Sequence, residues 1–164
     1  MKTSSRLTTL CLTLITGSIL FLTNCKKDTK DPDPTPVVST QTNTERLTGK
    51  NFKMTAATID PSILGVTDYY SQLPDCQKDD LIRFDTPNIF KSDEGATKCN
   101  TNDVQTKTGT WVWSTDETII TVTRSGEDPQ SWTVLINDGT TLKVKYTEKI
   151  NATNYTLTAT FVKQ

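Results

Sequence analysis

Residues 131–162, SWTVLINDGTTLKVKYTEKINATNYTLTATFV, contain the pattern that decides the fold. Apolar and polar residues alternate along three successive runs, which places one face of each strand against a core. Asn137-Asp138-Gly139 separates the first two runs and residues 151–154 separate the last two, and both are typical hairpin turns. The stretch therefore predicts three antiparallel strands. The residues expected on their inner faces are Trp132, Val134, Ile136, Leu142, Val144, Tyr146, Tyr155, Leu157, Ala159 and Phe161.

Similar short runs precede this stretch, at residues 47–58, 81–85, 88–93, 109–114 and 118–124. In the first run, Phe52, Met54 and Ala56 are expected to share the inner face. Eight sequential antiparallel strands are just enough to close an up-and-down barrel, which removes exposed sheet edges. A sandwich fits the same alternation, but the strand count and the short later connections favour the barrel. We therefore expect an all-β domain over residues 45–164, an eight-stranded antiparallel up-and-down β-barrel.

The long connection at residues 59–80 is amphipathic. Asp60-Pro61-Ser62 has the composition of a helix start, and apolar residues follow it. This predicts a short helical lid after the first strand, over residues 59–76. Such a lid either fills one end of the barrel as a plug or gates a ligand. Tyr69 and Tyr70 are candidate ligand-binding residues, because loop positions are where binding residues concentrate.

Three tryptophans, Trp111, Trp113 and Trp132, lie on predicted strands. Large aromatic side chains on facing strands commonly build the core. They can also line a ligand cavity, or stack on a sugar ring if they point outward. We expect them in the core and keep them as candidate ligand-binding residues.

The N-terminal segment predicts export and lipid attachment. Lys2 and Arg6 precede an apolar run from Leu7 to Leu22, and Cys25 follows directly after Asn24. Residues 1–24 are expected to be a lipoprotein signal peptide, and Cys25 to carry the lipid that anchors the chain in the bilayer. Residues 25–44 are polar and Pro-spaced, as in an extended tether. The expected location is the outer membrane, on its periplasmic face or at the cell surface.

The cysteines divide between these roles. Cys11 leaves with the signal and Cys25 carries lipid, so Cys76 and Cys99 remain as a pair in an exported domain. A disulfide between them is the expected state in an oxidising compartment.

Charge and composition exclude several function classes. The chain has 18 Lys and Arg, 19 Asp and Glu and no histidine, with no basic stripe typical of a nucleic-acid partner. It contains no nucleophile elbow and no phosphate loop, so we expect no enzyme and no cofactor.

Acidic residues gather around the predicted disulfide. We expect them to make turn hydrogen bonds, with Asp80 supporting the turn into the second strand, and we expect no metal site. These residues are Asp75, Asp79, Asp80, Asp85, Asp93 and Glu94. A calcium site is the alternative.

Several motifs along residues 45–164 resemble one known family. Leu47-Thr48-Gly49-Lys50-Asn51-Phe52 is similar to the Gly-x-Trp entry of lipocalins, with Phe52 in the place of the tryptophan. Residues 76–80, 94–99 and 109–111 continue the resemblance, which is to the lipocalin-like domain of Gram-negative lipoproteins. It implies a barrel that binds a small, partly apolar ligand beneath the lid, and hence a vacant interior. The alternative is a packed barrel that contacts protein or carbohydrate through its loops. The oligomeric state stays open.

Overall fold

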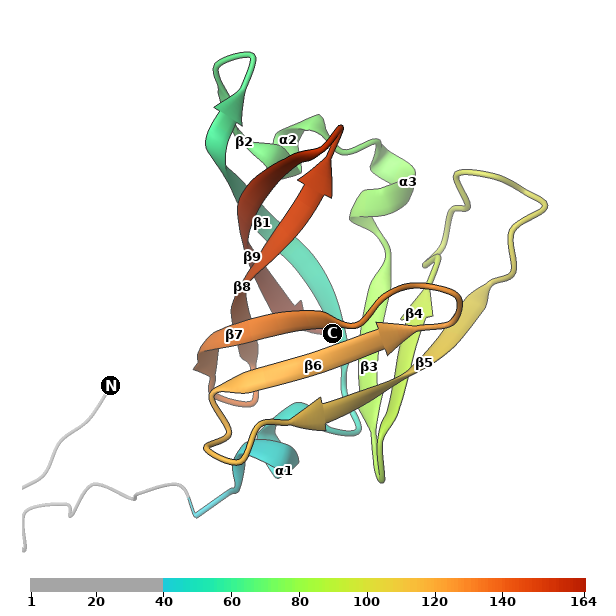
Figure 1. Cartoon of the computed structure of the whole chain (residues 1–164). Coiled ribbons are helices and arrows are strands. Elements are labelled where there is room, and N and C mark those ends of the chain that lie inside the picture. The colour runs from blue at the N-terminus through green and yellow to red at the C-terminus, as the bar shows by residue number, and fades with distance from the viewer. Residues whose placement is uncertain (1–39) are drawn as a thin grey trace, which may run out of the picture. The chain divides into compact units, whose positions relative to one another are not determined.

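The structure is a computed structural model that describes residues 40–164. The expected signal peptide, the expected lipid-attachment residue Cys25 and the tether up to residue 39 lie outside the described residues. Within residues 40–164, strands fill most of the chain (Figure 1). They are β1 (Asn51–Ile63), β2 (Val66–Asp68), β3 (Leu81–Asp85), β4 (Ile89–Asp93), β5 (Thr106–Trp113), β6 (Ile119–Arg124), β7 (Gln130–Asn137), β8 (Thr141–Ile150) and β9 (Thr153–Lys163).

The predicted eight-stranded antiparallel barrel is confirmed. The strand order is β1-β3-β4-β5-β6-β7-β8-β9, and β9 returns to pair with β1. The closing register runs from Phe52 opposite Lys163 to Asp60 opposite Thr156. The extra strand β2 pairs only with the far end of β1, as the second arm of a hairpin.

Two bulges change which side chains face inward, and they make two of the sequence predictions wrong. The register between β1 and β9 shifts between Met54 and Ala56, so Ala56 is exposed and Ala57 is buried. The register between β7 and β8 shifts between Val134 and Ile136, which leaves Ile136 42% exposed. A bulge inserts one unpaired residue, and every later side chain then changes face.

The lower end of the barrel, as drawn in Figure 1, is packed, so the expectation of a vacant interior is wrong for this part of the barrel. The short helix α1 (Asn43–Leu47) lies there and begins with a capping box formed by Thr42 and Glu45. Leu47, its last residue, is fully buried. Asn43 and the strand-end residue Asn137 join the helix to β7, since the Asn137 amide donates to the Asn43 carbonyl at 2.8 Å. Phe52, Phe84, Phe90, Trp111, Ile120, Val122, Leu142 and Val144 are among the buried residues of the core above it.

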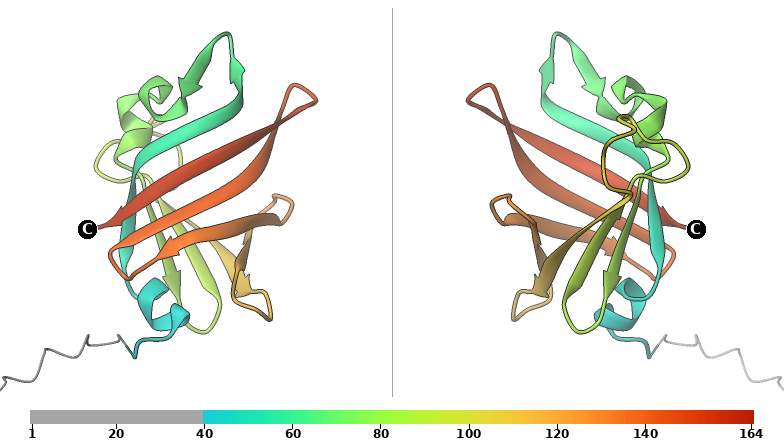
Figure 2. Two further views of the ribbon diagram at one scale, coloured as in Figure 1. Left: turned by 90° about the vertical axis from the view of Figure 1, so that its left-hand side faces the viewer. Right: turned by 90° about the vertical axis from the view of Figure 1, so that its right-hand side faces the viewer.

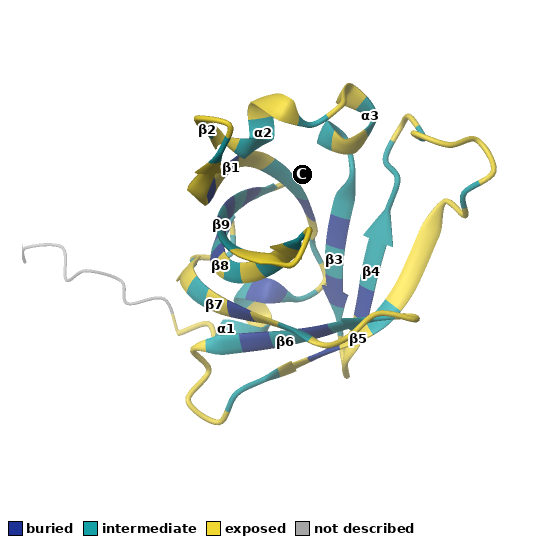
Figure 3. Cartoon of the chain, turned by 45° about the horizontal axis from the view of Figure 1, so that its top comes forward, coloured by how far each residue is buried: buried dark blue, intermediate teal, exposed yellow. Residues whose placement is uncertain are grey.

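The upper end carries the connection between β1 and β3. β1 continues through Asp60-Pro61-Ser62, so the predicted helix start there is wrong; Asp60 pairs with Thr156 and stays extended. The helices come later, as α2 (Tyr69–Gln72), capped by Asp68, and α3 (Asp75–Lys78). We call residues 66–80 the lid. The side views place it at the end opposite α1 (Figure 2), and α2 and α3 follow one side of the rim (Figure 3).

Gly109 marks a point where two strands approach too closely for a side chain. A Cβ at this position would collide with the Thr123 carbonyl oxygen on β6. We predict that Gly109→Ala lowers the free energy of unfolding by about 1–3 kcal/mol, the usual cost of overpacking. Chemical denaturation measures it, with Thr110→Ala at the exposed neighbouring position as the control, expected to change stability by less than about 0.5 kcal/mol. Equal stability of the two variants would contradict the close approach.

Candidate ligand cavity

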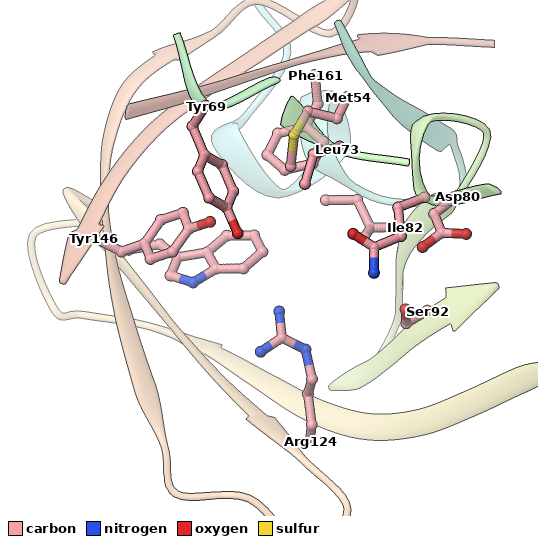
Figure 4. A pocket seen from close by; sticks show the side chains of 11 residues that line it. Met54, Tyr69, Leu73, Asp80, Ile82, Ser92, Arg124, Tyr146 and Phe161 are labelled. Atoms are coloured by element: carbon pink, nitrogen blue, oxygen red, sulfur yellow. The ribbon is translucent and has the colours of Figure 1, made fainter. Parts of the chain in front are cut away.

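A cavity of about 190 Å³ opens at the upper end of the barrel, beside the lid (Figure 4). Strands β1, β3, β4, β6, β7, β8 and β9 all contribute to its wall, together with the lid. The lining residues are Met54, Tyr69, Leu73, Gln77, Asp80, Ile82, Ser92, Arg124, Trp132, Tyr146 and Phe161. Small-ligand sites have this character, with mostly apolar and aromatic walls and a few polar groups.

Trp132 separates this cavity from the packed core. Its ring stacks on Tyr146 with centroids 5.6 Å apart and on Phe161 at 6.1 Å, and it meets Phe84 edge-on at 6.3 Å. Its indole Nε1 donates to the Gln130 side-chain oxygen at 2.6 Å, which fixes the ring orientation. Trp132 is only 2% exposed and still lines the cavity. It is therefore both a core residue and part of the cavity wall.

Arg124 places a cation inside the upper end of the barrel. Its guanidinium carbon lies 5.7 Å from the centre of the Phe90 ring and 5.9 Å from that of Trp132, within cation–π range. The local sequence explains the position. Gly109 pairs with Phe90 on one side and with Arg124 on the other, so no side chain from β5 separates the ring from the cation.

The hydrogen bonds of Arg124 leave most of its donors free. Its Nη1 lies 3.4 Å from the Glu127 carboxylate, which is a long contact with an exposed partner. Its Nε and Nη2 have no hydrogen-bond partner among the described residues. Figure 4 shows the guanidinium directed into the cavity, toward the side where Tyr69 and Tyr146 lie. Burial of Tyr146, with the nearby Glu148 carboxylate, raises its pKa to about 12, so this hydroxyl stays neutral.

Asp80 is the second charged group of the wall. Its Oδ1 is buried without a hydrogen-bond partner, so the prediction that Asp80 supports the turn into the second strand is wrong. The neighbouring Asp79 accepts instead from the Ala96 and Thr97 amides, at 2.9 and 2.8 Å, in the loop that follows β4. Burial raises the pKa of Asp80 to about 6, and the carboxylates of Glu94, Asp79 and Asp93 add to that rise.

A second cavity of about 250 Å³ adjoins the first and shares Asp80, Ser92 and Arg124 with it. Glu94, Lys107 and Glu127 make this second cavity more polar than the first. Arg124 thus stands between two cavities, the first with a mainly apolar wall and the second with a more polar one.

The predicted disulfide is confirmed. Cys76, in α3, bonds to Cys99 in the loop between β4 and β5. The bond joins the lid to this loop, and the Asp79 hydrogen bonds to residues 96 and 97 join them a second time. Gly95 allows this contact for two reasons. Its φ of +66° is a backbone conformation that favours glycine, and the Asp79 carbonyl lies too close to leave room for a Cβ.

The other candidate residues take different positions. Tyr69 and Tyr70 both pack partly buried against the core, and of the two Tyr69 lines the first cavity. Trp111 is 3% exposed and donates its Nε1 to the Asp85 carbonyl, below the cavity. Trp113 packs on Trp111, with centroids 6.2 Å apart. The described residues include no group of three or more His, Cys, Asp and Glu placed to hold a metal ion.

Sequence reasoning did not identify Arg124 or Asp80 as parts of a ligand site. Arg124 follows an alternating strand just before a turn, where a charged residue is ordinary. Its one sequence signal is the glycine at position 109, which interrupts a strand and indicates a close approach.

Within residues 40–164 no helix has the length and hydrophobicity needed to cross a membrane.

We predict that replacing both disulfide cysteines, Cys76→Ser with Cys99→Ser, lowers the free energy of unfolding by about 3 kcal/mol, since the crosslink restricts the unfolded chain. Chemical denaturation measures this loss. Hydrogen exchange of the Ala96 and Thr97 amides should also accelerate, because these amides bond to the lid. Unchanged exchange at both amides would show that Asp79 alone holds the loop.

The raised pKa of Asp80 predicts a pH dependence of stability. The folded state binds this proton more tightly than the unfolded chain does, so this contribution to the free energy of unfolding falls as pH rises from about 4 to about 6. Asp79 and Asp93 have lowered pKa values, so their contributions to the free energy of unfolding rise with pH instead. The measurement is therefore a comparison of the protein with Asp80→Asn. The variant should gain stability relative to the protein above pH 6, and a constant difference from pH 4 to 8 would contradict the prediction.

Comparison with known proteins adds no family assignment. No protein-family model matches the chain. No curated protein sequence matches it significantly either. The resemblance to lipocalin-like lipoproteins therefore stays a prediction, while the all-β barrel itself is what the structure shows.

Proposed function

We propose that this protein is a membrane-anchored lipoprotein whose barrel binds a small, partly apolar ligand in the upper cavity. The observation that carries the proposal is the division of the barrel at Trp132. Side chains fill the barrel below this ring, whereas above it a cavity remains, with the lid beside it. An interior filled to both ends would have favoured a purely structural role.

The character of the cavity wall supports a small ligand. Aromatic and aliphatic side chains supply most of the wall, and Arg124, Asp80, Gln77 and Ser92 supply the polar groups. The volume far exceeds the 30 Å³ or so that one water occupies, yet lies below the range of roughly 300–1,000 Å³ typical of drug-sized ligands. We propose binding without catalysis, in keeping with a chain that has no histidine.

The membrane anchor rests on the N-terminal sequence. Lys2, Arg6 and the apolar run before Cys25 support a lipoprotein signal, and the Pro-spaced residues after it support a tether. A lipid anchor would keep a binding domain near the membrane and so favours capture of a ligand there over its transport. The outer membrane is the proposed location.

A second candidate function is contact with another molecule through the loops. The tip of the β1–β2 hairpin favours it, because Leu64 is 99% exposed there. Ile59, Ile63, Val66, Tyr69 and Gln72 form with Leu64 a mostly apolar groove between the β1–β2 hairpin and α2.

We predict that the protein, purified from the cells that produce it, releases a small organic molecule when it is denatured. Mass spectrometry before and after denaturation detects the loss. Ser92→Trp should abolish retention, because position 92 lines both cavities and the indole would fill them. Ser131→Trp is the matched control, since it places the same side chain on the outer surface beside Trp132. Retention of the same molecule by Ser92→Trp, or none by the protein itself, would contradict the proposed function.

A further inference from the structure

The upper cavity contains two polar groups whose hydrogen-bonding capacity the protein does not use. Arg124 has two guanidinium nitrogens without partners among the described residues, and Asp80 has a buried oxygen without one. Buried polar groups in a folded domain are normally paired. The Asp80 oxygen is buried and Arg124 keeps only a third of its side chain exposed, so the two groups on one cavity wall indicate where a ligand supplies hydrogen bonds.

We infer that the ligand is a small organic acid, whose carboxylate pairs with the Arg124 guanidinium while its apolar body lies against Met54 and Leu73. The inference rests on the proposed binding function and names the ligand class. A guanidinium offers parallel N–H donors in a planar fork that matches a carboxylate, and such paired bonds are stronger and more directional than those of an ammonium.

The arrangement around Arg124 fits this role. Phe90 and Trp132 hold the cation in place from the core side. The Glu127 carboxylate, with which it makes an ion-pair contact, is 59% exposed and 3.4 Å away, so a ligand carboxylate competes with a weak contact. Figure 4 shows Met54, Leu73 and Phe161 gathered on the side of the cavity opposite Arg124. A ligand with an acid at one end and an apolar body therefore matches the two sides.

Asp80 makes this binding dependent on pH. The groups that face it are Asp79 of the lid, Asp93 and Glu94 at the end of β4, and Lys107 of β5. Above pH 6 or so the Asp80 carboxylate is ionised and repels a ligand carboxylate. Below that value it is a neutral carboxyl that can donate a hydrogen bond. A simple carboxylic acid, with a pKa of about 4.3, stays ionised over most of this interval. Affinity for an acid should therefore rise as pH falls from 8 to 5.5.

The test uses three probes with one apolar body: 3-phenylpropionate, 3-phenylpropanamide and 3-phenylpropylamine. Isothermal titration calorimetry measures their binding to the full lipoprotein in lipid nanodiscs, with empty nanodiscs as the blank. At pH 6 we expect the acid to bind at least about tenfold more tightly than the amide, as for a paired charge-assisted contact. Arg124→Gln should remove this preference and leave amide binding within about twofold, which also shows that the variant folds.

Two further charge variants make the test specific. Glu127→Gln removes the competing carboxylate and should strengthen acid binding. Lys145→Gln removes a cation from the exposed outer face of β8 and should change nothing. Asp80→Asn should bind the acid more tightly at pH 8 and abolish the rise in affinity at lower pH.

The outcomes separate this inference from the proposed function. Equal binding of acid and amide, or an acid preference that survives Arg124→Gln, overturns the organic-acid inference while the binding function stands. Tightest binding of the amine, lost in Asp80→Asn, overturns it in favour of a cationic ligand. If no probe binds, the test passes to the molecule that the purified protein retains. An acidic molecule supports the inference, and a neutral or cationic molecule overturns it. Binding of no probe together with no retained molecule rejects both.

Discussion

The pairing of β1 with β9 is the constraint on which the rest of the structure depends. It closes the sheet, so the side chains of every other strand are directed either into one interior or out to solvent. The bulge between Met54 and Ala56 lies within this pairing. It leaves Met54 beside the cavity and brings Ala57 and Ile59 inward above it. Because β1 then continues past the barrel as a hairpin arm, the chain returns along the rim, and the lid forms part of the cavity wall.

Trp132 sets the boundary between the two halves of the interior. Below it, Phe84 and Phe90 pack against its edges, and Leu47 of α1 is buried at the lower end. Above it, Tyr69, Tyr146 and Arg124 are among the residues that surround a remaining space of about 190 Å³. A packed core and a cavity therefore coexist in this barrel. The filled half supplies the stability, and one face of its largest ring becomes part of the cavity wall.

Alternation in the sequence was sufficient to predict the strands and the closure of the barrel, because a period of two is a direct consequence of strand geometry. The same alternation does not predict the two bulges, because a bulge leaves no mark in the pattern of apolar and polar residues. The bulges nevertheless turn Ala56 and Ile136 outward. The helix start at Asp60 was also misjudged, because pairing with β9 outweighs a local capping signal. The cavity could not be predicted either. It depends on which inward side chains meet across the barrel, and Arg124 reaches Phe90 only because residue 109 is glycine.

The charged groups of the cavity wall have a cost in the free protein, and under the proposed binding function this cost would make a small cavity selective. Arg124 is two-thirds removed from solvent and has one long hydrogen bond, while the Asp80 oxygen has none. Each group has lost part of its hydration without full replacement. By contrast, the Asp85 carboxylate is fully paired, with Arg83 and Lys91 at 2.7 and 2.8 Å. A ligand that completes the bonds of Arg124 restores what folding removed. A ligand without an acidic group leaves that deficit in place, so selectivity follows from the unpaired groups more than from the shape of the cavity.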